Sequence, residues 1–219
     1  MNTEELFSRL VSWIEKFPSK PMVEQLADEK HTPFQILVST MLSARTRDTV
    51  TIRVSRKLFK TAASPGDICE LGEKKLLDIL RPVGFYRTKT RNLIASSEII
   101  HKKYNDIPPD SLEELTALPG IGEKTATLVL IRVFSKNDIC VDTHVHRITN
   151  MWGIISEKTP EKTRKALLKT VPRKYWKEVN RTLVTLGQNI CGPVKKECKL
   201  CPVKELCPVF HKFCGDCKK

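Results

Sequence analysis

The chain has 219 residues, 40% of them hydrophobic, which allows one sizeable domain or two smaller ones. Its 38 Lys and Arg outnumber 25 Asp and Glu, and the formal net charge of +13 predicts a polyanionic partner such as nucleic acid. No segment has the roughly 18 uncharged apolar residues of a membrane span, and the N-terminus, with Glu4 and Glu5, lacks the cationic start of a signal sequence. We therefore expect a cytoplasmic, nucleoid-associated protein of prokaryotic type, with no targeting peptide and no membrane contact.

Apolar residues recur at helical spacing along most of the chain, and no segment alternates as a strand would. Start signals agree: Thr32-Pro33 and Thr159-Pro160 can each open a helix, and Ser111 with Glu114 forms a predicted capping box. The sequence therefore predicts an all-α protein. The apolar positions that support this interpretation are Phe7, Leu10, Val11 and Ile14, then Phe34, Leu37, Val38 and Met41, then Ala126, Val129, Leu130 and Val133, then Trp176, Val179, Leu183 and Leu186.

The segment Leu118–Ala126 reads LPGIGEKTA and lies between two predicted helices. Gly120 and Gly122 permit positive φ, so the backbone can turn tightly and point amide groups outward at the start of the next helix. We expect Gly120, Ile121 and Gly122 to bind a DNA phosphate together with the helix dipole. A simple Gly-rich connection is the alternative. A nucleotide-binding P-loop is excluded, because no glycine directly precedes Lys124 and no strand is predicted before the turn.

Lys124 falls in the first turn of the helix that follows this hairpin. There the helix dipole and partial burial would both disfavour the ammonium form, which predicts some free amine near neutral pH. A free amine in a basic, DNA-binding protein is a candidate nucleophile. The alternative is a solvated lysine that contacts a phosphate.

The segment Val141–Arg147 reads VDTHVHR and supplies a second candidate group, Asp142. Asp142 can cap the helix that follows it, and that structural role is a sufficient explanation in itself. It can also be a carboxylate kept ionised by helix-terminal amides, ready to stabilise positive charge that develops on a sugar. His144 and His146 diverge on a helix and are poor joint metal ligands, so we expect surface positions or phosphate contacts for them. Of this segment, His144 and Arg147 are the residues expected to bind DNA.

Cys191, Cys198, Cys201 and Cys207 are crowded into one short segment, separated by six, two and five residues. Thiolates this close together need a cation, which predicts a metal centre rather than unrelated cysteines. The nearly continuous run, in which prolines follow two ligands, favours a [4Fe-4S] cluster over zinc, although spacing alone leaves zinc open. Cys214 and Cys217 add a pair that suits a second metal or a regulatory disulfide. Cys69 and Cys140 are most simply buried apolar residues.

Taken in order, the hairpin, the VDTHVHR segment and the cysteine run resemble the endonuclease III family of helix-hairpin-helix DNA glycosylases over nearly the entire chain. The segment Met41–Ala44 belongs to the same resemblance. The family implies a two-lobed all-α fold: a six-helix barrel at residues 26–136, and a cluster-bearing lobe made of residues 1–25 and 137–219. It further implies a monomer that binds double-stranded DNA containing damaged bases or abasic sites, with the damaged base flipped out of the duplex.

By this resemblance the protein is expected to be a bifunctional DNA glycosylase and abasic-site (AP) lyase acting on oxidised pyrimidines. Lys124 would attack C1′ of the sugar to form a Schiff base, Asp142 would assist, and β-elimination would cut the strand on the 3′ side. The [4Fe-4S] cluster would shape the loop from Gly192 to Glu197 so that Lys195 and Lys196 reach phosphates. Two alternatives remain open: a monofunctional glycosylase for mismatched adenine, thymine or uracil, and a non-catalytic DNA-binding iron–sulfur protein.

One residue departs from the family pattern. Bacterial members commonly carry Gln after Leu-Ser-Ala, where it fills the gap left by the flipped base, and this chain has Arg45 there. Arginine is longer, charged and richer in donors, so the opposite-base preference of the family is not carried over. The alternative for Arg45 is a plain phosphate contact.

Overall fold

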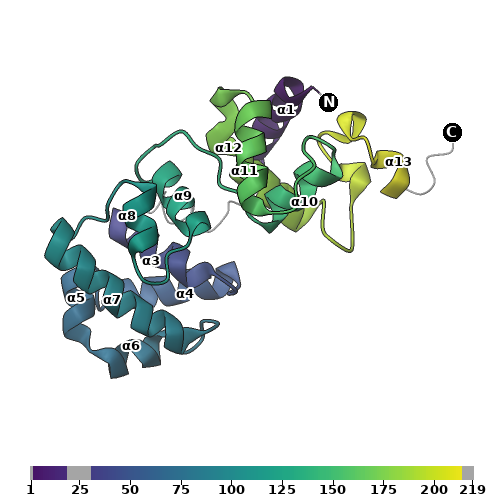
Figure 1. The fold of residues 1–219 in the computed structure, drawn as a ribbon. Coiled ribbons are helices and arrows are strands. Elements are labelled where there is room, and N and C mark those ends of the chain that lie inside the picture. The colour runs from purple at the N-terminus through teal and green to yellow at the C-terminus, as the bar shows by residue number, and fades with distance from the viewer. Residues whose placement is uncertain (1, 19–30, 214–219) are drawn as a thin grey trace. The chain divides into compact units, whose positions relative to one another are not determined.

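The computed structural model describes residues 2–18 and 31–213, and within these ranges it consists of helices and their connections (Figure 1). The described residues contain no strand, and the one ladder-type contact is an isolated bridge between Cys191 and Lys196. The all-α prediction is therefore confirmed. None of the described helices is long and apolar enough to cross a membrane. The chain divides into two compact units, residues 22–136 and residues 1–21 with 137–219, and the boundary near residues 21 to 26 lies outside the described ranges.

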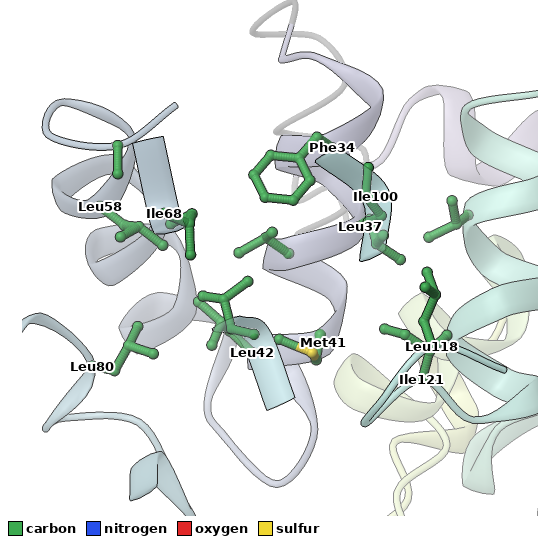
Figure 2. Close-up of a cluster of buried hydrophobic side chains, with 14 of the residues drawn as sticks. Phe34, Leu37, Met41, Leu42, Leu58, Ile68, Leu80, Ile100, Leu118 and Ile121 are labelled. Carbon is green, nitrogen blue, oxygen red and sulfur yellow. The ribbon is translucent and has the colours of Figure 1, made fainter. Parts of the chain in front are cut away.

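The unit of residues 22–136 is organised around α3, which is buried on most of its surface because apolar residues occupy most of its positions. Helices α4, α7 and α9 pack directly against it. Figure 2 shows the resulting cluster, with side chains of α4, α5 and α6 on one side of α3 and side chains of the hairpin segment on the other. The helices of this unit are α3 Pro33–Ser43, α4 Asp48–Phe59, α5 Pro65–Leu71, α6 Glu73–Leu80, α7 Tyr86–Tyr104, α8 Leu112–Ala117 and α9 Glu123–Arg132.

The predicted helix starts are confirmed by side-chain caps. Thr32 accepts a hydrogen bond from the Gln35 amide at 3.3 Å, and the Gln35 side chain accepts from the Thr32 amide at 3.0 Å. Ser111 accepts from the Glu114 amide at 3.2 Å and donates its hydroxyl to the Glu114 carboxylate at 2.9 Å. Each cap satisfies an amide that the first helical turn leaves without an intrahelical partner.

The second unit joins the N-terminal helix to the C-terminal part of the chain. Leu6, Phe7 and Leu10 of the first helix are fully buried in one cluster with apolar residues of α10 and α12. Thr159 caps α11, as predicted, by accepting from the Lys162 amide at 3.3 Å. The elements are α1 Thr3–Glu15, α10 Thr143–Met151, α11 Pro160–Thr170, α12 Trp176–Asn189 and α13 Phe210–Phe213, with short 3-10 turns at Arg173–Tyr175, Cys198–Leu200 and Lys204–Leu206.

Candidate functional site

The hairpin between α8 and α9 turns at Gly120, whose φ of +79° confirms the need for glycine at this corner. A Cβ at this position would lie 2.6 Å from Asn92 Nδ2. The corner is held against α7, because the Ser96 hydroxyl of that helix donates to the Pro119 carbonyl at 2.7 Å. Gly122 is different: its φ is −91°, so the prediction of a second positive-φ corner is wrong. Gly122 instead serves as the N-cap of α9.

Of the predicted phosphate-binding residues, Ile121 turns inward. Its side chain is 5% exposed and packs in the core, and its amide donates to the Leu118 carbonyl at 3.1 Å. A contact through Ile121 itself is therefore not supported. The amides that point along the axis of α9 toward solvent are those of its first turn, which lack intrahelical acceptors. Open space surrounds the position of a Cβ at Gly122, so an anion can approach this helix end closely.

The two glycines should respond differently to substitution. Gly120→Ala should lower the free energy of unfolding by about 1–3 kcal/mol, because alanine is strained at positive φ and its methyl group meets Asn92. Gly122→Ala is the matched control and should stay within about 1 kcal/mol of wild type, because its φ is ordinary and its surroundings are open. Urea unfolding measures both values. Equal destabilisation by the two substitutions would contradict this description of the hairpin.

Lys124 is the second residue of α9, and its side chain is exposed. The position in the first turn of a helix agrees with the prediction. The predicted partial burial is wrong, because Lys124 is exposed within the unit of residues 22–136. Glu123 and Lys124 follow the hairpin without an intervening turn, so Lys124 belongs to the first turn of α9. The structure thus presents an accessible amine at the end of the molecule's glycine-cornered hairpin.

Asp142 is the N-cap of α10, as predicted, and is 8% exposed. Its Oδ1 atom accepts hydrogen bonds from the amides of His144 at 2.9 Å and Val145 at 3.0 Å. The segment before it is held by α12, because Asn180 donates its side-chain amide to the Cys140 carbonyl at 3.2 Å. Asp142 is therefore a fixed carboxyl group at a helix N-terminus, held by two backbone amides.

The residues that follow Asp142 on α10 make more contacts with other parts of the same unit than the sequence predicts. A side chain at Gly187 of α12 would collide with the His144 ring, so the two helices pack closely at this point. His146 is partly exposed, and its Nδ1 lies 2.7 Å from the Thr163 hydroxyl of α11. Arg147 donates from Nη2 to the Cys191 carbonyl at 2.6 Å, which ties α10 to the cysteine segment. For His144 and Arg147, these internal contacts leave the predicted DNA contact without support.

Arg45 lies in the turn after α3 and is exposed, with a left-handed φ of 52°. Its guanidinium carbon lies 5.4 Å from the centroid of the Phe85 ring, a cation–π distance. Phe85 is itself left-handed at φ 58° and 61% exposed. The sequence analysis did not identify Phe85, because nothing in a local pattern pairs its turn with Arg45. It also missed Lys89, which contacts the same turn.

The four cysteines of the predicted metal centre lie in one partly buried region. Burial raises the pKa of Cys201 to about 12, and the thiols of Cys207, Cys191 and Cys198 act in the same direction. Burial likewise raises the pKa of Cys198 and of Cys207. Without a cation these thiols would remain protonated. Within residues 2–18 and 31–213, no three His, Cys, Asp or Glu side chains are arranged as metal ligands, so the [4Fe-4S] assignment stays a prediction.

Two features around the cysteines suit an anionic, sulfur-ligated group. The indole N–H of Trp152 is buried, and no acceptor among the described residues lies in hydrogen-bonding geometry to it. The indole N–H faces the Cys207 thiol. Burial raises the pKa of this thiol, and the smaller effects of the Val209 amide and the Trp152 indole lower it. Nη1 of Arg147 is also buried without an acceptor among the described residues. Buried donors of this kind are satisfied when a thiolate or cluster sulfur accepts from them.

The loop from Gly192 to Glu197 carries two lysines that the sequence assigns to phosphate contacts. Lys195 forms an ion pair with Glu197 at 2.7 Å, but its side chain remains 87% exposed. Lys196 donates to the Pro193 carbonyl at 3.2 Å, and its Nζ lies 4.4 Å from the centroid of Phe213. Lys195 can be released to a phosphate at small cost because its ion pair is solvent-exposed. The pair Cys214 and Cys217 lies outside the described residues.

The chain is similar to known proteins along most of its length. Residues 38–173 match the HhH-GPD superfamily of base excision DNA repair proteins. The sequence is 40% identical to endonuclease III of Thermotoga maritima over 201 residues, which cover 87% of this chain and 94% of that protein. A solved structure of a trapped endonuclease III–DNA covalent intermediate, an estranged-adenine complex, is 27% identical with a TM-score of 0.82 and covers 97% of this chain and 98% of its own. A thermostable thymine-DNA glycosylase, 20% identical with a TM-score of 0.84 over 96% of this chain and 97% of its own, shows the fold alone.

Proposed function

This chain belongs to the endonuclease III family of HhH-GPD base excision repair proteins and is a DNA glycosylase and AP lyase, and from this we propose that Lys124 is its nucleophile. The observation that carries the proposal is the exposed amine of Lys124 in the first turn of α9, directly after a hairpin that can bind a phosphate. The proposed substrate is double-stranded DNA with oxidised pyrimidines or abasic sites, bound by a monomer.

In the proposed reaction, the unprotonated Nζ of Lys124 attacks C1′ of the deoxyribose, and the glycosidic bond breaks with its electron pair leaving on the base. The base takes up a proton and departs. Loss of the proton on nitrogen and opening of the sugar ring leave an imine between Nζ and C1′. Removal of a proton from C2′ then expels the 3′ phosphate oxygen by β-elimination, which cuts the strand on its 3′ side. Water finally hydrolyses the imine and returns the amine.

Asp142 supports this reaction as a carboxylate whose Oδ1 accepts hydrogen bonds from two amides of α10, which hold it in place. The sugar becomes positively charged as the base departs, and a fixed negative charge lowers the energy of that transition state. The same carboxylate is also suited to accept a proton from the attacking amine. We assign Asp142 to one or both of these roles, and in either role its charge is what matters.

DNA binding is assigned to two places in the unit of residues 22–136. The N-terminus of α9, with Gly120 and Gly122, takes one backbone phosphate without reading sequence. Arg45, stacked on Phe85, is assigned to the gap that the flipped base leaves. An arginine there donates to the acceptors of the unpaired opposite base, so purines and pyrimidines opposite the lesion should be processed at different rates.

The cysteine segment fits a [4Fe-4S] cluster, which Cys191, Cys198, Cys201 and Cys207 would hold. Burial and the neighbouring thiols raise the pKa of Cys198, Cys201 and Cys207, so a cationic core is needed to bind them as thiolates. The buried donors of Trp152 and Arg147 need acceptors. Bound there, the cluster would supply rigidity to the loop from Gly192 to Glu197. Lys195 on this loop is then a second phosphate contact, with Lys196 held against Phe213 behind it.

Cys201→Ser tests the metal assignment. Loss of this ligand should remove the brown colour and most of the iron, because serine is a poor ligand for iron–sulfur clusters. Visible absorption and iron analysis measure the change. Cys69→Ser is the control, since Cys69 lies on α5 in the other unit and should keep both signals. A colourless wild-type protein with one bound zinc would contradict the assignment.

The lesion class is tested by single-turnover excision from duplexes that each contain one modified base opposite each of the four bases. Oxidised pyrimidines should be removed faster than mismatched adenine, thymine or uracil. Faster removal of the mismatched bases, without strand nicking, would favour a monofunctional glycosylase instead. Binding without turnover on every duplex would favour a non-catalytic DNA-binding protein.

A further inference from the structure

Lys89, in the first two turns of α7, is a buried lysine that the proposed reaction does not use. Its side chain is 7% exposed. Nζ donates to the Leu42 carbonyl at 2.7 Å, the Ala44 carbonyl at 2.6 Å and the Thr46 hydroxyl at 3.2 Å. All three acceptors belong to the end of α3 and the turn that follows it. Lys89 of α7 thus caps the C-terminus of α3.

These contacts suit an ammonium group. The last carbonyls of a helix lack intrahelical donors and form the negative end of its dipole, so a cation with three donors satisfies several of them at once. Burial lowers the pKa of Lys89 to about 8, which leaves the group mostly charged at neutral pH. The three oxygen acceptors also favour the charged form.

The same network fixes the backbone on both sides of Arg45. Thr46 Oγ1 accepts from Lys89 and also from the Gly84 amide at 3.2 Å, so it links the turn after α3 to the turn before α7. A Cβ at Gly84 would lie 2.5 Å from the Arg45 carbonyl oxygen, so the two turns are in close contact. Arg45 and Phe85 are both left-handed, a conformation that persists in such residues only where the surroundings enforce it.

We propose that Lys89 is a positioning residue for damage recognition, whose buried ammonium holds the left-handed turn that presents Arg45 to the DNA. This inference rests on the proposed role of Arg45 in filling the gap left by a flipped base. Without the ammonium, the Leu42 and Ala44 carbonyls and the Thr46 hydroxyl lose a donor, so the left-handed turn loses three of the hydrogen bonds that hold it. Arg45 then leaves Phe85 and samples many orientations, so that filling the gap costs the entropy of ordering it again.

The inference is tested by a double-mutant cycle between Lys89→Met and Arg45→Ala, with single-turnover excision of an oxidised pyrimidine from duplex DNA. Lys89→Met should slow excision about tenfold or more. It should have little further effect when Arg45 is already alanine, because both substitutions remove the same contact. Fluorescence of 2-aminopurine placed opposite the lesion should report a less ordered base in either variant. Equal losses from Lys89→Met in the presence and absence of Arg45 would overturn the inference.

Controls separate positioning from a general structural role. Borohydride trapping on a single-stranded abasic oligonucleotide needs no gap to be filled, so Lys89→Met should keep this activity while it loses duplex excision. Parallel loss of both activities would overturn the inference. Lys102→Met is the matched control on the same helix, since Lys102 is 75% exposed, and it should be as active as wild type. If Lys89→Met fails to fold, Thr46→Val removes only the hydroxyl that joins the two turns and should show the same pattern to a smaller degree.

The outcomes also distinguish this inference from the proposed function. A wild-type protein that is neither trapped on abasic DNA nor active on lesions would refute the proposed function. An active wild type, a slow Arg45→Ala variant and a fully active Lys89→Met variant would refute the inference alone. An Arg45→Ala variant as fast as wild type would remove the role of Arg45 and the inference together.

Discussion

Lys124→Gln should abolish strand nicking at abasic sites and lower base excision on the order of 10³-fold or more. Glutamine keeps a polar side chain of similar reach on the first turn of α9, but its amide nitrogen is not a nucleophile and cannot form an imine. DNA binding should weaken much less, because the hairpin and the end of α9 remain. Denaturing gel electrophoresis of a labelled abasic duplex, with binding measured in parallel, separates the two effects.

The chain contains its own control for this substitution. Gly72-Glu73-Lys74 begins α6 with the same three residue types as Gly122-Glu123-Lys124 at the start of α9. In both helices glycine is the N-cap and an exposed lysine is the second helical residue, although φ is +79° at Gly72 and −91° at Gly122. If a lysine at a helix N-terminus were sufficient for catalysis, Lys74→Gln would also reduce nicking. We expect Lys74→Gln to be as active as wild type. Nicking that survives Lys124→Gln would remove Lys124 from the mechanism.

Asp142→Asn should lower base excision about 10²-fold while the fold is preserved. Asparagine caps a helix about as well as aspartate, so the hydrogen bonds to the His144 and Val145 amides can persist. The substitution therefore removes the negative charge and little else. Single-turnover excision and thermal unfolding, measured on the same preparation, provide the comparison.

Asp142→Ala distinguishes the charge from the cap. Alanine removes both, so this variant should also lose about 1 kcal/mol of stability, whereas Asp142→Asn should stay closer to wild type. Activity equal to wild type in Asp142→Asn, with a loss only in Asp142→Ala, would show that Asp142 acts as a helix cap and has no chemical role.

The fold was largely predictable from the sequence because its determinants are local. Thr32, Ser111 and Thr159 cap helices where the pattern places them. Gly120 adopts the positive φ that its place in the hairpin predicts. A cap or a tight corner is specified by residues a few positions apart, and such signals survive in a single sequence.

The parts of the site that the sequence did not predict depend on contacts between distant segments. Lys89 caps the C-terminus of α3, which ends at Ser43, 46 positions earlier in the sequence. No local pattern identifies Lys89 as a capping residue. Arg147 contacts Cys191 across 44 positions of sequence, so it was assigned to DNA instead. Glycine permits a positive φ at Gly122, yet the N-cap geometry of α9 does not require one. No local pattern specifies the burial of Lys124, and the side chain is exposed.

The covalent bond itself gives the most direct test of the central claim, that Lys124 becomes joined to DNA. The protein should be incubated with an abasic duplex and reduced with borohydride, which converts an imine to a stable secondary amine, and then digested and mapped by mass spectrometry. The account predicts that the sugar remnant is found on the Lys124 side chain. A remnant attached to Lys89, Lys74 or any other amine, or no adduct from a protein that nicks the strand, would contradict it.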